Sequence, residues 1–419
     1  MKVVQYLLVL VILTCWCVLL AVMPAGAQEL VVPGDKDGDK VVTGDELADS
    51  IMAYLRGKYL AENVEQPGLD TLREAAHIHA YYPRRIIDSA NRAVTIYMPI
   101  KRAITLTSDS AEGIRILGAV DNIIGVTDTI KEEGKEYFPE LLDKPSVGTW
   151  KEFNFEKIVE LASDKSGIII PDIIVISYVY KVSGVEDGLS PFDNIAVLGL
   201  DLYKSDTLED ELIKLGYIIE REEEAQDFVT WCSEKEDAVR NAVYGRKRPK
   251  VYIEKGNSKG TGELGTYGRG SALDELCEIA GGDNIAKGIA KEYPKVDWEW
   301  VTTENPDIIL KSEPKTFIGL TGDAEGIRKE VMDRIPGDIS AIRTGKVHVY
   351  TRKITFGLES VVGLTYWAKI FYPDSRLDPE AVYKDYLEKY QGLEYPEDKM
   401  VVLPNVWVEF HIEVGHFYL

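Results

Sequence analysis

The sequence "TLEDELIKLGYIIEREEEAQDFVTWCSEKEDAVRNAVYGR", residues 207–246, interrupts an otherwise regular alternation of strand-like and helix-like segments. It contains no proline and ends in a basic turn, which is typical of one or two long helices. The alternation restarts at residue 250. The segment therefore predicts a connecting helix, residues 207–247, between two α/β units.

On both sides of this segment, short apolar runs rich in β-branched residues alternate with stretches of helical periodicity, which predicts parallel sheets with crossover helices. We expect an α/β fold of two Rossmann-like lobes, residues 86–206 and 248–395, joined by the long α-helix. Ligands of open α/β sheets bind beyond the carboxyl ends of the strands, so the loops there should face a cleft between the lobes. The strand candidates are residues 102–107, 122–127, 172–177, 194–200, 250–256, 306–312 and 346–351.

The composition is that of a large globular protein with an acidic surface. The 419 residues are enough for two or three domains. Lys and Arg together number 48 against 70 Asp and Glu, so the net charge is -22. A field of this sign repels phosphate backbones, which excludes nucleic acid as an expected partner.

The first residues, "MKVVQYLLVLVILTCWCVLLAVMPAGAQ", have the order of an export signal: a lysine, an apolar run and small residues. We expect a signal peptide, residues 1–27, cleaved after Ala27. The apolar run is also long enough to span a bilayer, so an uncleaved anchor is the alternative. In both cases the remainder is exported and extracytoplasmic. Of the cysteines left, Cys277 is expected to be a buried apolar residue rather than half of a disulfide.

Five stretches in order resemble the solute-binding proteins of ABC importers for iron-siderophore, haem and cobalamin complexes. The resemblance covers roughly residues 86–392. It implies a rigid, monomeric binding protein without catalysis, which captures a metal chelate and delivers it to an ABC permease and its ATPase. The stretches that carry it are residues 88–106, 146–177, 265–286, 296–310 and 349–374.

The resemblance also implies how the protein contacts the permease. In this family one glutamate near the tip of each lobe pairs with permease arginines, and the matching residues are Glu156 in "FNFEKI" and Glu299 in "VDWEWV". Carboxylates suit planar arginine forks in charge and in geometry. The alternative is that both carboxylates serve the dipoles of the helices that they begin.

A metal chelate is large, partly aromatic and often anionic, so its site should combine aromatic walls with hydroxyl groups and a few cations. Loops at the ends of predicted strands offer such side chains, each of which could instead pack between loop and sheet. The ligand-binding candidates are Ser108, Asp109, Thr149, Trp150, Tyr178, Tyr180, Tyr267, Arg269, Arg352 and Phe356.

Near the start, "DKDGDKVVTGDE", residues 35–46, resembles an EF-hand-type calcium loop, and more closely the single-loop half of a dockerin-like module. The preceding "LVVPG" cannot form an entering helix, whereas an amphipathic helix follows. The pattern departs from the family at Lys40, where glycine is expected. The alternative is an acidic, solvated turn. The calcium ligands would be Asp35, Asp37, Asp39, the backbone carbonyl of Val41, Thr43 and Glu46.

Enzyme signatures do not stand out in the sequence. It has no nucleophile elbow, no HExxH pattern and no cysteine pair at zinc spacing. The predicted domain order is therefore the signal, a calcium-loop module at residues 28–85, the first lobe, the connecting helix, the second lobe and a tail at residues 396–419. A protein of this order could alternatively be a calcium-dependent surface adhesion or scaffold protein.

Overall fold

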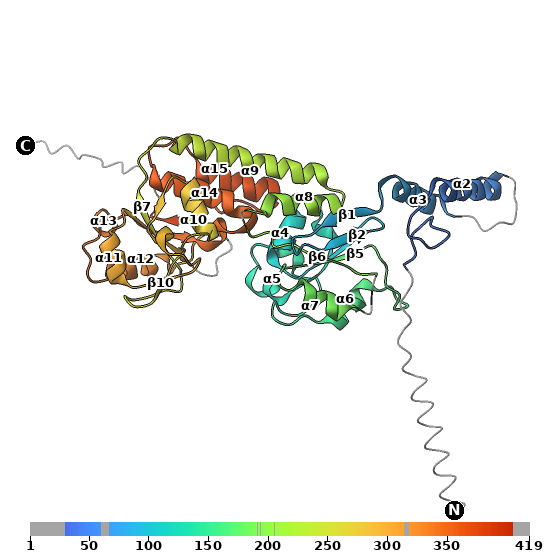
Figure 1. Ribbon diagram of the computed structural model, residues 1–419, viewed down its shortest axis with the longest axis horizontal. Coiled ribbons are helices and arrows are strands. Elements are labelled where there is room, and N and C mark those ends of the chain that lie inside the picture. Colours follow the sequence, from blue (N-terminus) through green and yellow to red (C-terminus); the bar gives the residue numbers. More distant parts are fainter. Residues whose placement is uncertain are drawn as a thin grey trace, which may run out of the picture.

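The computed structural model describes residues 30–59, 67–190, 192, 194–204, 206–313 and 318–404. The predicted signal peptide, residues 1–27, and the tail beyond residue 404 lie outside the described residues. Within these ranges, no helix combines the length and the apolar character needed to cross a membrane. Figure 1 shows two α/β lobes side by side, with one long helix, α9, running along both.

The first lobe is built on a four-stranded parallel sheet of order β4-β3-β5-β6. Its central strand β5 is buried along its whole length, as a strand covered on both faces by helices should be. All four strands coincide with predicted ones. They are β3 (Arg102–Thr105), β4 (Ile123–Val126), β5 (Ile173–Ser177) and β6 (Ala196–Gly199).

Helices cross between these strands, and three of the four begin shortly after a strand ends. The first of them, α4, is capped by Thr107, whose side chain accepts a hydrogen bond from the Ser110 N–H at 3.0 Å. Such a cap satisfies one of the amides that a helix start leaves unpaired. The helices of this lobe are α4 (Ser108–Ile116), α5 (Asp128–Glu133), α6 (Phe155–Ala162) and α7 (Val182–Leu189).

The connecting segment forms two helices, α8 (Leu208–Ile218) and α9 (Glu222–Val243). They are separated at Glu220, which has a left-handed backbone with φ of 58°. Gly216 permits the close turn, because a Cβ there would lie 2.7 Å from the Ala225 Cβ. The segment predicted to form one or two long helices is therefore a short helix and a long one packed together.

The second lobe has a five-stranded sheet of order β13-β12-β11-β7-β9, in which only β13 is antiparallel. Its three long strands are β7 (Lys250–Glu254), β11 (Ile308–Glu313) and β12 (Val347–Thr351), and all three were predicted. The short strands are β9 (Asp283–Asn284), β13 (Val402–Leu403) and the separate pair β8 (Leu264–Gly265) and β10 (Lys295–Val296).

The longest helix of the second lobe, α14, is buried over most of its length. Cys277 of α10 is buried and unbonded to another cysteine, which confirms its expected role as a small apolar residue. The helices here are α10 (Ala272–Ile279), α11 (Trp298–Glu304), α12 (Ala324–Met332), α13 (Ser340–Arg343), α14 (Ser360–Phe371), α15 (Pro379–Asp385) and the π-helical η6 (Tyr386–Tyr390).

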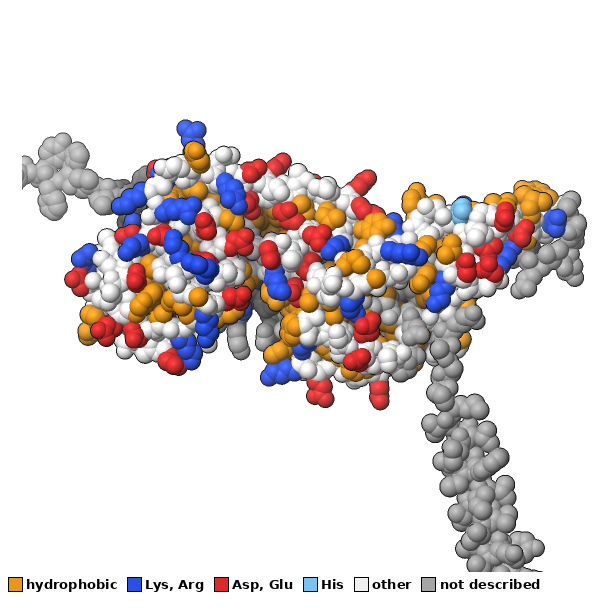
Figure 2. Space-filling model, viewed as in Figure 1, with side chains coloured by type: hydrophobic (Ala, Val, Ile, Leu, Met, Phe, Trp, Pro, Cys, Tyr) orange, Lys and Arg blue, Asp and Glu red, His pale blue; other side chains and the backbone are white. Residues whose placement is uncertain are grey.

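An N-terminal unit of two helices, α2 (Gly44–Tyr59) and α3 (Leu69–Tyr81), precedes a hairpin of β1 (Arg84–Ile87) and β2 (Ala93–Ile96). Its helices extend away from the lobes, and Figure 2 shows hydrophobic side chains gathered at their far end. The unit is tied to the turn between α8 and α9 at Glu220, which accepts hydrogen bonds from His77 at 2.6 Å and from the Tyr82 hydroxyl at 3.0 Å. The two helices are therefore attached to the lobes by directed contacts and not only by the chain.

The two lobes meet at a buried carboxylate. Glu112 of α4 is fully buried and forms an ion pair with Lys353, which follows β12 in the second lobe. The same carboxylate accepts hydrogen bonds from the hydroxyls of Tyr137, at 2.8 Å, and of Tyr386. Nearby, Gly357 has φ of 65°, and a Cβ there would lie 3.2 Å from the Leu202 carbonyl oxygen of the first lobe. This glycine lets the two backbones approach.

Candidate ligand-binding cleft

A cavity of about 470 Å³ lies between the lobes, at the carboxyl ends of the strands. Most of its wall comes from the first lobe, and one short segment after β12 supplies the second-lobe side. The lining residues are Leu106, Thr107, Ser108, Asp109, Thr127, Thr129, Trp150, Tyr178, Tyr180, Tyr203, Arg352, Lys353 and Phe356.

The floor of the cavity is polar. Asp109, in the first turn of α4, accepts a hydrogen bond from the Tyr178 hydroxyl at 2.8 Å. Burial raises the pKa of Asp109 above its usual range, although Lys353 opposes the shift. Burial, together with Asp109, likewise raises the pKa of Tyr178. The pair therefore offers a ligand a hydroxyl and a carboxyl group held in a fixed orientation.

The first-lobe wall is aromatic. The rings of Tyr178 and Tyr180 stack with centroids 5.5 Å apart, and Tyr203 meets Tyr178 edge-on at 5.6 Å. Trp150 and Tyr180 remain 49% and 64% exposed. The ammonium of Lys181 lies 5.0 Å from the centroid of the Trp150 ring. Large aromatic faces left open beside a cation are suited to covering a flat or partly aromatic ligand.

The second-lobe wall is cationic. The Arg352 guanidinium lies 4.6 Å from the centroid of the Phe356 ring. The next residue, Lys353, is drawn into the lobe interface by Glu112. Burial alone would lower the pKa of Lys353, but the neighbouring carboxylates of Glu112, Glu359 and Asp109 raise it. Lys353 is therefore protonated, and its positive charge is balanced by the carboxylate of Glu112.

The structure brings most of the predicted ligand-binding residues to this cavity. Ser108, Asp109, Trp150, Tyr178, Tyr180, Arg352 and Phe356 all line it.

Three predicted residues do not line the cavity. The Thr149 hydroxyl accepts hydrogen bonds from the Lys151 and Glu152 amides and so closes its own turn. Tyr267 is only 5% exposed and packs within the second lobe. Arg269 is exposed, and its Nε donates to the Lys287 carbonyl at 3.2 Å.

Other lining residues went unpredicted, and their positions explain why. Thr127 and Thr129 follow β4, and Tyr203 follows β6, so the rule that strand ends face the cleft would have found them. Lys353 stands beside the predicted Arg352, and nothing local distinguishes the two. Their roles differ only because Glu112 of the other lobe forms an ion pair with Lys353 and not with Arg352.

Comparison with known proteins agrees with this architecture. A family model described as "Periplasmic binding protein" matches residues 104–353, which is more than half of the chain. The chain belongs to this periplasmic binding protein family.

Two relatives of this chain are named for different ligands. The molybdate-binding protein MolA of Haemophilus influenzae is 24% identical over 344 residues, 75% of this chain and 93% of that protein. A vitamin B12-binding protein of Salmonella paratyphi A is 24% identical over 188 residues, 44% of this chain and 65% of that protein.

A solved structure shows the same fold. The TroA-like periplasmic binding protein FepB from Veillonella parvula superposes with a TM-score of 0.62 at 21% identity, covering 77% of this chain and 99% of that one. The two α/β lobes of the periplasmic binding protein fold are therefore present here, as predicted from the alternation around residues 207–246.

The two glutamates predicted to contact the permease lie in equivalent positions of the two lobes. Glu156 and Glu299 are exposed, and each stands in the first turn of a helix, α6 and α11. The helices belong to different lobes and lie away from α9 (Figure 1). Both helix starts are capped by a side chain, Asn154 in α6 and Asp297 in α11.

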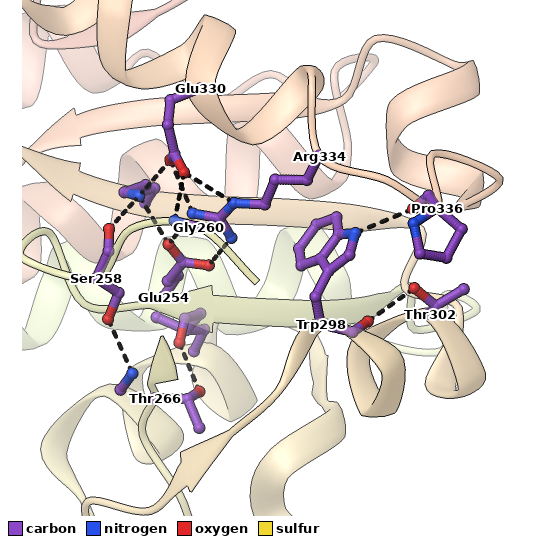
Figure 3. A network of polar contacts seen from close by, with 12 residues as sticks. Glu254, Ser258, Gly260, Thr266, Trp298, Thr302, Glu330, Arg334 and Pro336 are labelled. Carbon is purple, nitrogen blue, oxygen red and sulfur yellow. Dashed lines mark hydrogen bonds and ion pairs between the residues drawn. The ribbon is translucent and has the colours of Figure 1, made fainter. Parts of the chain in front are cut away.

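A buried charge network supports α11 (Figure 3). The Trp298 indole N–H donates to the Pro336 carbonyl at 3.0 Å, and the Arg334 guanidinium lies 4.9 Å from the Trp298 ring centroid. Arg334 donates to both oxygens of Glu254, at 2.6 and 2.8 Å, and also pairs with Glu330. Trp298 immediately precedes Glu299, so this network holds the start of the helix that presents Glu299.

In the loop at residues 35–46, three of the six predicted calcium ligands come together. Oxygen atoms of Asp35, Asp37 and Asp39 all lie within 4.8 Å of one another. Lys40 adopts φ of 68°, the left-handed conformation of the usual glycine, and its N–H donates to Asp35 at 2.9 Å. The Glu46 carboxylate accepts hydrogen bonds from the Thr43 and Lys36 amides, at 2.8 and 2.7 Å, and these hydrogen bonds lower the pKa of Glu46 to about 2.

The lobe interface predicts a pH dependence of stability. Burial raises the pKa of Glu359 from 4.5 to about 8, with Lys353 opposing the shift. Between these values the folded protein holds a proton that the unfolded chain has lost. The free energy of unfolding therefore falls as pH rises through this window, by an amount on the order of a few kcal/mol.

Glu359→Gln removes this contribution. We expect the melting temperature of the native protein to fall more steeply between pH 5 and pH 8, a window set by the folded pKa of about 8, than that of the variant. Scanning calorimetry at matched ionic strength measures it. Glu223→Gln, an exposed residue of α9, is the control and should follow the native curve. Parallel curves for Glu359→Gln and the native protein would contradict the prediction.

Proposed function

We propose that this protein is the extracytoplasmic solute-binding component of an ABC importer, and that it carries an iron(III)-siderophore or a related metal chelate. The observation that supports this most is the cavity between the lobes. Its volume of about 470 Å³ falls within the range of about 300–1,000 Å³ usual for sites that enclose a small organic ligand. A bare oxyanion would leave most of such a cavity unfilled.

The lining favours a chelate over a simple ion. Trp150 and Tyr180 keep about half or more of their surface open at the cavity, and an organic ligand would cover these apolar faces and gain their burial energy. The hydroxyls of Ser108, Tyr180 and Tyr203 also belong to lining residues and suit the oxygen atoms of a chelate. Cobalamin and haem have the same mixture of ring surface and polar edge and are the alternative ligands.

Isothermal titration of the purified protein with ferric enterobactin, ferrichrome, haemin, cyanocobalamin and molybdate tests this proposal. We expect one of the organic metal complexes to bind and molybdate not to bind. The variant Trp150→Ala/Tyr180→Ala should bind it about 10-fold more weakly or worse, because two aromatic contacts are lost. Tyr244→Ala, which removes a ring that is 89% exposed on the connecting helices' C-terminal side, should bind normally. Failure of every complex to bind would overturn the proposal.

We also propose that Glu156 and Glu299 contact arginines of the permease, one from each lobe. Replacing both by arginine should leave chelate affinity unchanged, because neither residue lines the cavity. Stimulation of the transporter ATPase, or uptake, should be lost through charge repulsion. Glu223→Arg/Glu234→Arg makes the same charge change at exposed residues of α9 and should transport normally. Normal transport by the Glu156/Glu299 variant would remove the docking assignment.

Calcium binding by the loop at residues 35–46 stays a prediction. The donors Asp35, Asp37 and Asp39 converge, and oxygen ligands of this kind are those that calcium prefers. Adding calcium, but not the same concentration of magnesium, should increase the hydrogen-exchange protection of residues 30–59 and leave the lobes unchanged. Asp37→Asn should abolish the effect, whereas Asp45→Asn, outside the predicted ligand set, should retain it. Equal exchange with calcium and with chelator would contradict the prediction.

A further inference from the structure

Helix α2 carries more large apolar side chains on its outward face than on the face that packs against α3. Its buried and half-buried side chains include Leu47, Ser50, Ala53, Tyr54 and Gly57, so the inward face is mostly small or polar. A helix that needs no further partner normally turns its large apolar side chains inward. The large apolar side chains of the outward face are Ile51, Met52, Leu55 and Tyr59, which are between 39% and 69% exposed.

These four side chains form one continuous stripe, which we call the α2 stripe. Successive residues of an α-helix are about 100° apart around its axis, so positions 51, 52, 55 and 59 fall within one sector about 100° wide. Figure 2 shows hydrophobic side chains gathered at the far end of the N-terminal helices. Other exposed apolar residues, such as Tyr244 and Ile335, stand singly in the chain and need no explanation. The α2 stripe is therefore a contiguous apolar surface suited to a partner.

Two opposite charges, Asp49 and Arg56, lie along one flank of the α2 stripe. They are two turns apart, or about 10.5 Å along the axis, and so fall on the same side of the helix. Residues of one helix pair at a spacing of three or four, so these two charges do not pair with each other. Asp49 lies 3.5 Å from Lys36, but their side chains are 75% and 45% exposed, and such a pair contributes little.

The positions of these charges complement a second copy of the same helix. In an antiparallel pair whose two-fold axis passes between Met52 and Ala53, Arg56 of each copy lies opposite Asp49 of the other. The same symmetry sets the two apolar stripes face to face, with Ile51 of each copy beside Leu55 of the other. A parallel pair would instead place Asp49 opposite Asp49 and Arg56 opposite Arg56, which is unfavourable. The stripe and its flank therefore favour one orientation of one partner.

The N-terminal unit leaves room for this pairing. His79 of α3 donates through Nδ1 to the Val42 carbonyl at 2.6 Å, which holds the start of α2 near the end of α3, where the chain enters the lobes. Helix α2 then runs away from the lobes (Figure 1). Antiparallel pairing of two 16-residue helices therefore places the two sets of lobes at opposite ends, about 24 Å apart along the helix axis. Both ligand cavities stay open in this arrangement.

We propose that this protein forms an antiparallel homodimer through the α2 stripe, with Asp49 and Arg56 of the two copies paired reciprocally. The expectation of a monomer comes from the resemblance of the lobes, and the family match at residues 104–353 does not include α2. One pair of short helices buries less than the roughly 1,200 Å² usual for stable complexes, so the dimer is weak and depends on concentration. The inference goes beyond the proposed transport function and does not rest on it.

Sedimentation equilibrium of the purified protein tests the dimer. The native protein should pass from monomer to dimer as its concentration rises into the high micromolar range. Ile51→Gln/Leu55→Gln should weaken dimerisation about 100-fold, because apolar area at the centre of the interface is lost. Tyr244→Gln/Ile335→Gln, which replaces two exposed apolar residues outside α2, should dimerise as the native protein does. A monomer at every concentration, or equal dimerisation of both variants, would overturn the proposal.

A charge exchange tests whether the partner is a second copy. Asp49→Arg alone and Arg56→Asp alone should each weaken dimerisation about 10-fold, because two like-charge contacts replace two ion pairs. Asp49→Arg/Arg56→Asp should restore it, although the contact of Asp49 with Lys36 stays lost. Association through any other apolar segment would not respond to these charges, so absence of recovery would overturn the proposal.

Vesicles of phosphatidylcholine test the competing occupant of the α2 stripe, a lipid surface. The proposed dimer buries the stripe, so we expect Ile51→Gln/Leu55→Gln and the native protein to bind the vesicles equally. Binding of the native protein as a monomer, lost in this variant, would overturn the dimer and assign the stripe to a membrane.

Discussion

The buried ion pair between Glu112 and Lys353 is the contact on which the arrangement of the two lobes depends. Glu112 is fully buried in α4, and its other partners are the hydroxyls of Tyr137 and Tyr386. Removing Lys353 by substitution would leave the Glu112 charge buried without its partner, and breaking a buried pair in this way costs about 3–5 kcal/mol. This buried ion pair therefore holds the two lobes together and sets the width of the cleft.

The connecting helices add to this constraint through aromatic packing. Phe228 and Trp231 of α9 pack against Tyr386 and Tyr390 of the C-terminal helical segment, with centroids 4.9–6.3 Å apart. The hydroxyl of Tyr386 in turn reaches Glu112. The long helix, the end of the second lobe and the first lobe thus share one buried region, which favours a cleft formed before the ligand arrives.

Two neighbouring cations at the cleft, Arg352 and Lys353, have different roles. Lys353 serves the lobe interface, while its neighbour Arg352 points its charge at the cavity. A protein with a net charge of -22 would repel an anionic ligand from most of its surface. At the cavity, the Arg352 guanidinium lies over the Phe356 ring, which keeps one positive charge on the second-lobe wall.

The sequence by itself determined the architecture. The proline-free residues 207–246 and the seven apolar runs around them were sufficient to predict two parallel-sheet lobes and their connection, because strand and helix periodicity are local properties. It also located seven cavity residues, such as Asp109 and Tyr178, since strand ends face the cleft in this fold. Only the tertiary structure decided that Tyr267 and Arg269 lie off the cavity, and that Lys353 pairs with Glu112 of the other lobe while Arg352 lines the cavity. Each of these depends on partners far apart in the chain, and burial and charge pairing are properties of that assembly and not of any segment.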